Sequence, residues 1–187
     1  VFAAQALLLA AALVMLWSLF LAHRFEYAYV AQYSSRALSP ALTFAASWAG
    51  QEGSILLWVT LAALLGMALL RQPGVLTRPA MFFVSLLQSL LMMLLLVRSP
   101  FRLSAVVPQD GQGLNPLLED PWMVVHPPVL FLGYAALALP FALGLAALRV
   151  QAQPGAGADL GDALEEGLAA LVERLVAVDE EARELTR

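Results

Sequence analysis

Four long apolar runs set the strongest limit on how this chain folds. Each is 17 to 22 residues long, which as a helix spans roughly 25–33 Å, close to the thickness of the hydrocarbon core of a bilayer. Inside lipid every backbone polar group must be paired within its own segment, so each run is expected to be a helix. The runs cover residues 1–22, 54–70, 80–97 and 129–148. The sequence therefore predicts an all-α polytopic membrane protein, a helical bundle with about four transmembrane helices.

Composition agrees with a membrane protein. The chain is 61% hydrophobic with a mean hydropathy of +0.78, against roughly 45–50% apolar residues in soluble domains. Val1 already lies inside an apolar run, without the basic start or the cleavage site of a signal peptide. We therefore expect a chain that begins inside a longer protein or has lost its start. The absence of cysteine excludes thiolate metal sites and disulfides.

The charges indicate an orientation in the membrane. Residues 1–158 hold seven Arg and five acids (7 − 5 = +2), whereas residues 159–187 hold three Arg and nine acids (3 − 9 = −6). Nothing in this balance indicates nucleic-acid binding. The short acid-free loop at 72–79 contains Arg78 and follows Arg71, which predicts a cytoplasmic position for this loop and for the C-terminal tail. The long connections at 23–53 and 99–128 are then predicted to lie on the outer side of the membrane.

The first long connection contains alternating aromatic residues. Phe25, Tyr27 and Tyr29 indicate a short extended or interfacial segment, and three aromatics near a helix end are typical of an aromatic belt at the membrane boundary. Residues 41–50 are apolar but too short to span, so they are expected at the interface.

Glu52 stands in the sequence Gly-Gln-Glu-Gly-Ser just before the second apolar run. Gly50 and Gly53 would allow a turn, and Ser54 would cap the helix. Glu52 then lies in the first turn, where the helix dipole favours a carboxylate. Alternatively, Glu52 handles protons or contacts a quinone, because acids at membrane depth are often functional.

The second long connection carries one of the two histidines. Prolines at positions 100, 108, 116, 121, 127 and 128 predict an ordered, irregular outer loop. Pro127 biases His126 towards an extended conformation, and Pro128 suits the first position of the next helix. His126 is therefore predicted just outside the bilayer, before the helix begins, as a candidate axial ligand of haem iron. A structural hydrogen-bonding role is the alternative, and His23 is expected to pair with its charged neighbours.

The C-terminal segment has a different pattern. Residues 151–158 are predicted to be a linker, and residues 159–187 an acidic amphipathic helix. Its apolar residues are spaced four and three apart, which favours dimerisation or docking on a partner. A solvated acidic tail is the alternative. The apolar positions are Leu164, Leu168, Leu171, Leu175, Val178, Ala182 and Leu185.

Three sequence pieces together resemble the CcmF family, the haem lyase components of cytochrome c maturation, and their relatives in nitrite-reductase haem assembly. They are Tyr-Val-Ala-Gln-Tyr-Ser at 29–34, Trp-Ala-Gly-Gln-Glu-Gly-Ser-Ile-Leu-Leu-Trp at 48–58, and Leu-Asn-Pro-Leu-Leu-Glu-Asp-Pro at 114–121 followed by Val-His-Pro-Pro-Val-Leu-Phe-Leu-Gly-Tyr at 125–134. The resemblance covers residues 1–150 and corresponds to the N-terminal part of the family's sequence.

The resemblance implies a haem-handling membrane subunit. Its relatives receive haem b as cargo from a haem chaperone on the outer face and present it to the CxxCH site of apocytochrome c. The histidine of their His-Pro-Pro motif is an axial haem ligand, which corresponds to His126. Trp122 and Tyr134 are further candidate haem contacts, and Asp120 and Glu119 are candidate partners of the imidazole.

The family's later features are expected beyond residue 149 and do not follow here: the tryptophan-rich segment, a second outer histidine and the histidines for a transmembrane haem. A gene fragment, a frame change or a split subunit would each account for this, and activity of the chain alone is not expected. The alternative to haem handling is a membrane scaffold that recruits a partner through its acidic C-terminal helix.

Overall fold

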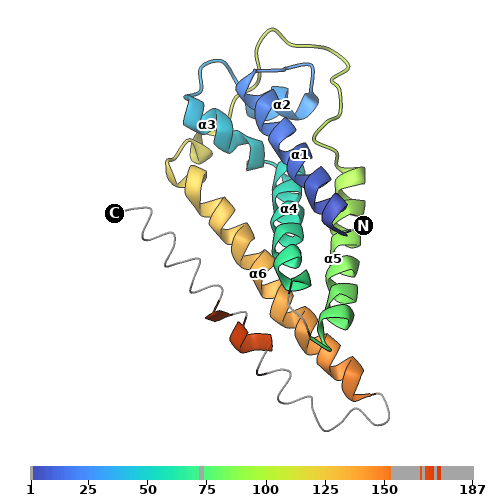
Figure 1. The fold of residues 1–187 in the computed structure, drawn as a ribbon. Coiled ribbons are helices and arrows are strands. Elements are labelled where there is room, and N and C mark those ends of the chain that lie inside the picture. Colours follow the sequence, from blue (N-terminus) through green and yellow to red (C-terminus); the bar gives the residue numbers. More distant parts are fainter. Residues whose placement is uncertain (1, 72–73, 153–164, 166, 171, 174–187) are drawn as a thin grey trace.

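The computed structural model describes residues 2–71 and 74–152, together with residues 165, 167–170 and 172–173 of the C-terminal segment. This part of the chain is helical and contains no strand (Figure 1). Four helices are long and apolar enough to cross a membrane, which confirms the predicted bundle. The elements are α1 (Phe2–Leu21), α2 (Ala28–Tyr33), α3 (Pro40–Ala45), η1 (Ala46–Trp48), α4 (Gln51–Leu70), α5 (Thr77–Val97), η2 (Pro116–Leu118) and α6 (Trp122–Gln151).

Much of the predicted C-terminal organisation lies outside the described residues. The predicted linker at 151–158 is described only for its first two residues, of which Gln151 still belongs to α6. The apolar positions predicted for a C-terminal helical seam are described only at Leu168, which is exposed.

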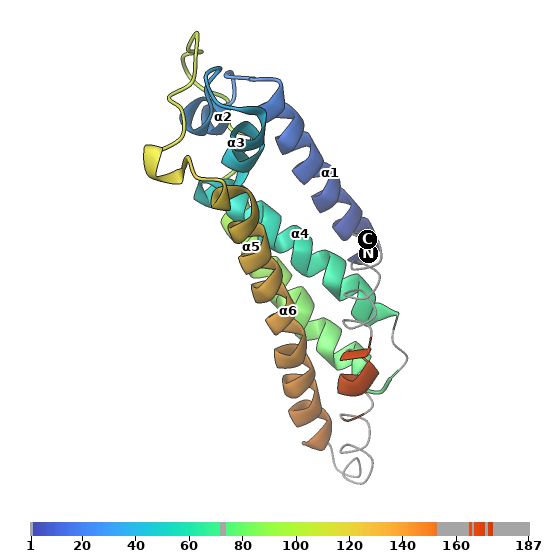
Figure 2. The ribbon, with the colours of Figure 1, turned by 90° about the vertical axis from the view of Figure 1, so that its left-hand side faces the viewer.

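Helix α4 is the centre of the bundle. It packs against α1, α5 and α6, as the two perpendicular views show (Figures 1 and 2). In the apolar stretch of α4, 56% of the residues are buried, against 28–33% in the corresponding stretches of the other three spanning helices. A helix that is apolar on all sides is expected in such a central position. The outer three helices instead expose large apolar side chains such as Leu7, Leu96 and Leu137, as a lipid-facing surface requires.

Polar side chains link α4 to its neighbours inside the apolar bundle. The Gln88 Nε2 group of α5 donates to the Val59 carbonyl oxygen at 3.2 Å. The Thr60 hydroxyl donates to the Leu56 carbonyl oxygen of its own helix at 2.7 Å and reaches the Leu9 carbonyl oxygen of α1 at 3.4 Å. Such bonds hold helices together where lipid provides no hydrophobic driving force.

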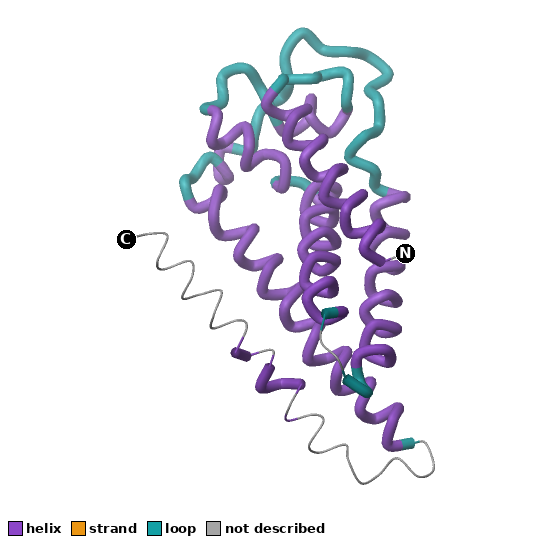
Figure 3. Tube along the Cα trace, in the orientation of Figure 1, coloured by secondary structure: helices purple, strands orange, loops and turns teal. Residues whose placement is uncertain are grey.

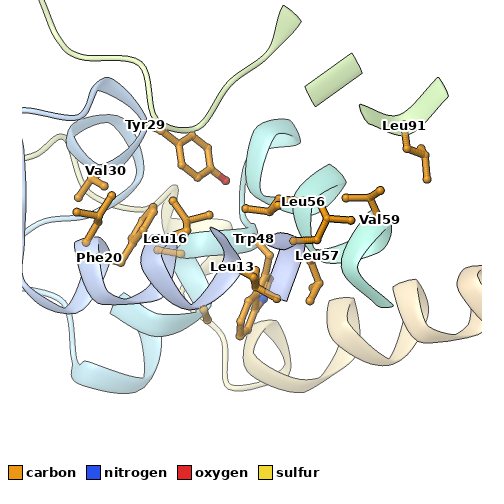
Figure 4. Packing of buried hydrophobic residues seen from close by; sticks show 14 of the residues in the cluster. Leu13, Leu16, Phe20, Tyr29, Val30, Trp48, Leu56, Leu57, Val59 and Leu91 are labelled. Atoms are coloured by element: carbon orange, nitrogen blue, oxygen red, sulfur yellow. The ribbon is translucent and has the colours of Figure 1, made fainter. Parts of the chain in front are cut away.

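The larger buried cluster lies at the end of the bundle where the long connections are found. It joins α1, α2, η1 and α4 through residues that include Leu16, Phe20, Tyr29, Trp48 and Leu56 (Figure 4). A second cluster, which includes Leu69, Ala80 and Leu143, lies where α4 ends and α5 begins. The two clusters fix both ends of the bundle.

The two long connections meet at one end of the bundle, where Figure 3 shows the loops gathered. Backbone N–H groups of the second connection donate to carbonyl oxygens of the first: Ser104 to Glu26 at 2.8 Å, Gln112 to Ala31 at 2.7 Å and Gly113 to Ser34 at 3.0 Å. The Asp110 carboxylate accepts from the Arg36 backbone N–H at 3.0 Å, and this bond lowers the pKa of Asp110. The connections therefore form one ordered cap, as the sequence predicted for the second.

The prediction for the aromatic segment at residues 25–29 is confirmed only at Tyr27, which is extended and forms an antiparallel bridge with Leu103. Residues from Ala28 onwards form helix α2, and Phe25 and Tyr29 are buried instead of forming a membrane-facing belt. The Tyr29 ring packs edge-on against Phe20, with centroids 5.5 Å apart. Burial against the end of α1 explains why these aromatics do not face lipid.

Candidate functional site

His126 lies inside helix α6, so the expectation that it precedes the helix in an extended conformation is wrong. Helix α6 begins at Trp122, where the Asp120 carboxylate accepts from the Trp122 backbone N–H at 2.8 Å. The Met123 and Val124 backbone N–H groups donate to the carbonyl oxygens of Asp120 and Pro121. The helix therefore starts at Trp122, well before the expected start at Pro128, and Pro127 and Pro128 fall within its second turn.

The helix tolerates Pro127 because another side chain replaces its missing N–H group. In a regular helix, the amide of residue 127 would donate to the carbonyl oxygen of Met123. The Trp48 indole Nε1 donates to that carbonyl oxygen at 2.9 Å. Trp48 is 4% exposed and is held in place by the Phe44 ring, whose centroid lies 4.9 Å away. The start of α6, and with it His126, is thereby fixed to η1.

The His126 side chain is exposed on the outer end of α6. Helical spacing places Trp122, Val129 and Gly133 on the same face of α6, and all three are exposed. A Cβ atom added at Gly133 would meet nothing within 4 Å, so the surface below His126 is open. Within the described residues, the imidazole has no hydrogen-bond or ion-pair partner, and neither Asp120 nor Glu119 binds it. His126 is therefore available to an external ligand.

Tyr134 does not share this face. It follows His126 by eight residues, which rotates it by about 80° around the helix axis. Its ring lies against Trp58 of α4 and Phe131, with centroid distances of 5.9 and 6.2 Å. The three residues predicted to contact haem, Trp122, His126 and Tyr134, are therefore not all on one face. Trp122 lies on the His126 face, whereas Tyr134 belongs to an aromatic group between α4 and α6.

Sequence reasoning missed Trp58 and Phe131 as members of this aromatic group. The Trp58 Nε1 group is buried and has no hydrogen-bond partner within the described residues. The sequence did point to both residues, since Trp58 is the last residue of the motif at 48–58 and Phe131 lies in the motif at 125–134. The fold shows that the two motifs meet in space, because the Trp58 and Phe131 centroids are 6.4 Å apart.

The turn before α4 is built by close backbone contacts. Ser54 does not cap α4, contrary to expectation: Gly50 is the N-cap residue, and the Ser54 hydroxyl donates to the Trp48 carbonyl oxygen at 2.8 Å. A Cβ atom at Gly53 would lie 1.7 Å from the Ser47 carbonyl oxygen, so only glycine fits there. The same motif therefore positions the Trp48 indole that supports α6.

Tyr29 joins α2 to this turn. Its hydroxyl donates to the Ser47 carbonyl oxygen at 3.1 Å and accepts from the Gly50 backbone N–H at 3.0 Å. Burial of the phenol raises the pKa of Tyr29, since the phenolate would be desolvated. The first and second sequence motifs thus form one hydrogen-bonded unit.

Glu52 lies in the first turn of α4, as predicted, and is half-buried. It lines a polar pocket of about 210 Å³ together with residues of α2 and of the end of α5. None of the pocket's lining residues belongs to α6. The predicted functional residues therefore occupy two separate places, His126 with Trp122 on α6 and Glu52 between α2, α4 and α5.

Together these features define a polytopic membrane protein with an ordered cap and an exposed histidine at the start of its last spanning helix. The family model described as cytochrome C assembly protein matches residues 48–183. The chain belongs to this cytochrome c assembly family. Its four long apolar helices make it a membrane protein.

Curated relatives agree with this assignment. The cytochrome c-type biogenesis protein CcmF of Pseudomonas aeruginosa is 38% identical over 135 residues, which are 69% of this chain and 20% of that protein. The probable cytochrome c-type biogenesis protein NrfE of Escherichia coli is 39% identical over 150 residues, 78% of this chain and 27% of that protein. The chain thus spans about a fifth to a quarter of these relatives' length. No solved structure matches it significantly.

Proposed function

We propose that this chain is a membrane subunit of a cytochrome c maturation system that binds haem on the outer face through His126 and helps to deliver it to apocytochrome c. The observation that carries the proposal is the unpartnered, exposed imidazole of His126 on a helix end fixed by Trp48. A ligand for an incoming metal must be both accessible and held in place. The family assignment supplies the biological setting.

The surface below His126 suits a flat apolar cargo. Val129 and Gly133 continue the exposed face of α6 towards the membrane, and Trp122 stands one turn before His126. The open space over Gly133 lets a planar ring approach the helix backbone closely. In this proposal haem b is cargo, and the His126 imidazole would coordinate its iron.

The arrangement of charges supports an outer position for this site. The end of the bundle opposite His126 carries Arg71, Arg78 and Arg149, which the positive-inside rule assigns to the cytoplasm. The cap and His126 are then periplasmic, the membrane is the inner membrane, and the tail is cytoplasmic. The proposed partners are apocytochrome c, a haem chaperone and other subunits of the maturation system.

A co-purification experiment tests the delivery role. The tagged chain is expressed with haem and with an apocytochrome c whose CxxCH motif is intact or changed to SxxSH. We expect the intact apocytochrome to co-purify with the parent chain, and its yield to fall severalfold with His126→Ala and with SxxSH. His23→Ala is the matched histidine control and is expected to retain the parent yield. Equal yields for the parent and His126→Ala would overturn the role of His126.

A further inference from the structure

The polar pocket beside Glu52 has the chemistry of a binding site, and the proposed haem site does not use it. Two arginines line the cavity, Arg98 at the C-terminal end of α5 and Arg102 in the connection that follows it. Gln32 of α2 and Glu52 of α4 complete its polar lining. The cavity measures about 210 Å³, large enough for a phosphate group and a few attached atoms. Within the described residues, neither arginine forms an ion pair.

The walls of the pocket are joined mainly by backbone bonds, and of the charged side chains the Arg102 guanidinium donates to the Val97 carbonyl oxygen at 3.5 Å. The Ala28 backbone N–H donates to the Arg102 carbonyl oxygen at 2.9 Å, and Tyr27 and Leu103 form an antiparallel bridge. These contacts fix the arginine segment to the start of α2. On the other wall, the Tyr29 hydroxyl ties α2 to the turn before α4. The segment that carries Arg102 and the turn that precedes Glu52 are therefore both fixed relative to α2.

The pocket lies at the level where lipid headgroups are expected. The apolar span of α5 ends at Val97, and Arg98 follows immediately. The last turns of α5 expose Met93, Leu94, Leu96 and Val97, which form an apolar surface leading up to the arginines. Acyl chains could lie along this surface while the headgroup enters the pocket. Basic pockets between transmembrane helices bind anionic lipid headgroups in other membrane proteins.

The charges select the kind of headgroup. Arg98, Arg102 and Glu52 carry formal charges that sum to +1 (2 − 1), which matches the single negative charge of a phosphodiester better than the greater charge of a free phosphate. The guanidinium groups can pair with the phosphodiester oxygens. Glu52 and the Gln32 side-chain oxygen can accept hydrogen bonds from headgroup hydroxyls. Phosphatidylglycerol has both features, a monoanionic phosphodiester and two free hydroxyls.

We infer that the pocket formed by Gln32, Glu52, Arg98 and Arg102 binds the headgroup of an anionic phospholipid of the phosphatidylglycerol type. Its acyl chains lie on the exposed face of α5. The site is separate from His126 and does not depend on haem binding. It anchors the cap of the protein to the surface of one leaflet.

The test is a lipid-binding titration of the delipidated full chain in detergent, in which native mass spectrometry measures the amount of bound lipid. The probes are phosphatidylglycerol and phosphatidylcholine. Phosphatidylcholine has the same monoanionic phosphodiester, but its headgroup has no free hydroxyl and its choline cation leaves no net charge. We expect phosphatidylglycerol to bind more tightly than phosphatidylcholine. The double variant Arg98→Gln/Arg102→Gln should weaken phosphatidylglycerol binding about 25-fold, from roughly fivefold for each arginine. Arg78→Gln, at the opposite end of α5, is the matched control and should change binding less than about twofold.

Three results would overturn the inference: equal binding of the two lipids, equal binding by the double variant and Arg78→Gln, or displacement of phosphatidylglycerol by inorganic phosphate at equal concentration. The last would mean that the pocket takes a free anion. Both arginine side chains are exposed, so the variants are expected to fold. If the double variant is not recovered in folded form, the two single variants give the same comparison with smaller effects.

Discussion

The indole Nε1 of Trp48 donates a hydrogen bond to the carbonyl oxygen of Met123 at 2.9 Å, the carbonyl that Pro127 leaves without a helical partner. The donor and the acceptor lie 75 residues apart in the sequence, and the indole takes the place of the N–H group that Pro127 lacks. The proline after His126 would otherwise leave a carbonyl unpaired near the membrane boundary. The tryptophan and the proline are best understood as one structural unit that supports His126.

Trp48→Phe is expected to destabilise the protein by about 1–3 kcal/mol, because it leaves the Met123 carbonyl oxygen unpaired while it keeps an aromatic ring. The measurement is detergent-based unfolding followed by circular dichroism. Trp122→Phe removes an indole that is 74% exposed and is the control, with an expected change of less than about 0.5 kcal/mol. Equal losses in the two variants would contradict the role given to Trp48.

Gly53→Ala is expected to be among the most damaging substitutions in the chain. The new Cβ would lie 1.7 Å from the Ser47 carbonyl oxygen and 2.6 Å from the Tyr29 hydroxyl, so the turn before α4 must shift. We predict a loss of more than about 2 kcal/mol or failure to fold. Gly133→Ala meets open space on α6 and is expected to be neutral or slightly stabilising, by up to about 1 kcal/mol. A thermal-stability comparison that ranks the two variants equally would refute this difference.

Tyr29 is predicted to make stability depend on pH in the alkaline range. Burial raises the pKa of Tyr29 above its ordinary value of 10.0, so the folded state favours the protonated phenol. The contribution of the protonated Tyr29 to the free energy of unfolding is fully present below pH 10. It is lost as the pH rises above 10, because Tyr29 ionises first in the unfolded state. The free energy of unfolding should therefore fall by up to about 1.4 kcal/mol per pH unit above 10 from this residue.

Tyr29→Phe removes this contribution, and unfolding measured between pH 8 and 11 should then fall less steeply than in the parent. Tyr33→Phe is the comparison, since burial also raises the pKa of Tyr33 but that ring is less enclosed. Its effect should have the same sign and a smaller size. Parallel pH curves for the parent and Tyr29→Phe would show that Tyr29 does not ionise in the unfolding reaction.

The four spanning helices could be predicted because their physical basis is local. Lipid leaves an apolar segment of about 20 residues few alternatives to a helix, so the predicted run at 1–22 and the observed α1 (Phe2–Leu21) nearly coincide. The two long connections were also expected on the same side of the bundle, from the distribution of the arginines. These inferences needed no knowledge of which side chains touch.

The start of α6 could not be predicted in the same way. The local preference of a residue before proline places His126 outside the helix. That preference is overruled by the Asp120 cap and by the Trp48 indole, which comes from a distant segment. The same holds for Tyr29, whose burial depends on contacts with Phe20 and the turn at Gly50. Tertiary contacts therefore decided the geometry around both motifs.

The central claim is that His126 binds haem iron, and the most direct measurement is an absorption spectrum, oxidised and reduced, of the detergent-purified chain expressed with haem available. The parent is compared with His126→Ala and with the control His23→Ala. We predict a Soret band in the parent and in His23→Ala that is lost in His126→Ala, with all three proteins equally helical. A folded parent without a Soret band, or a band of equal strength in His126→Ala, would contradict the claim.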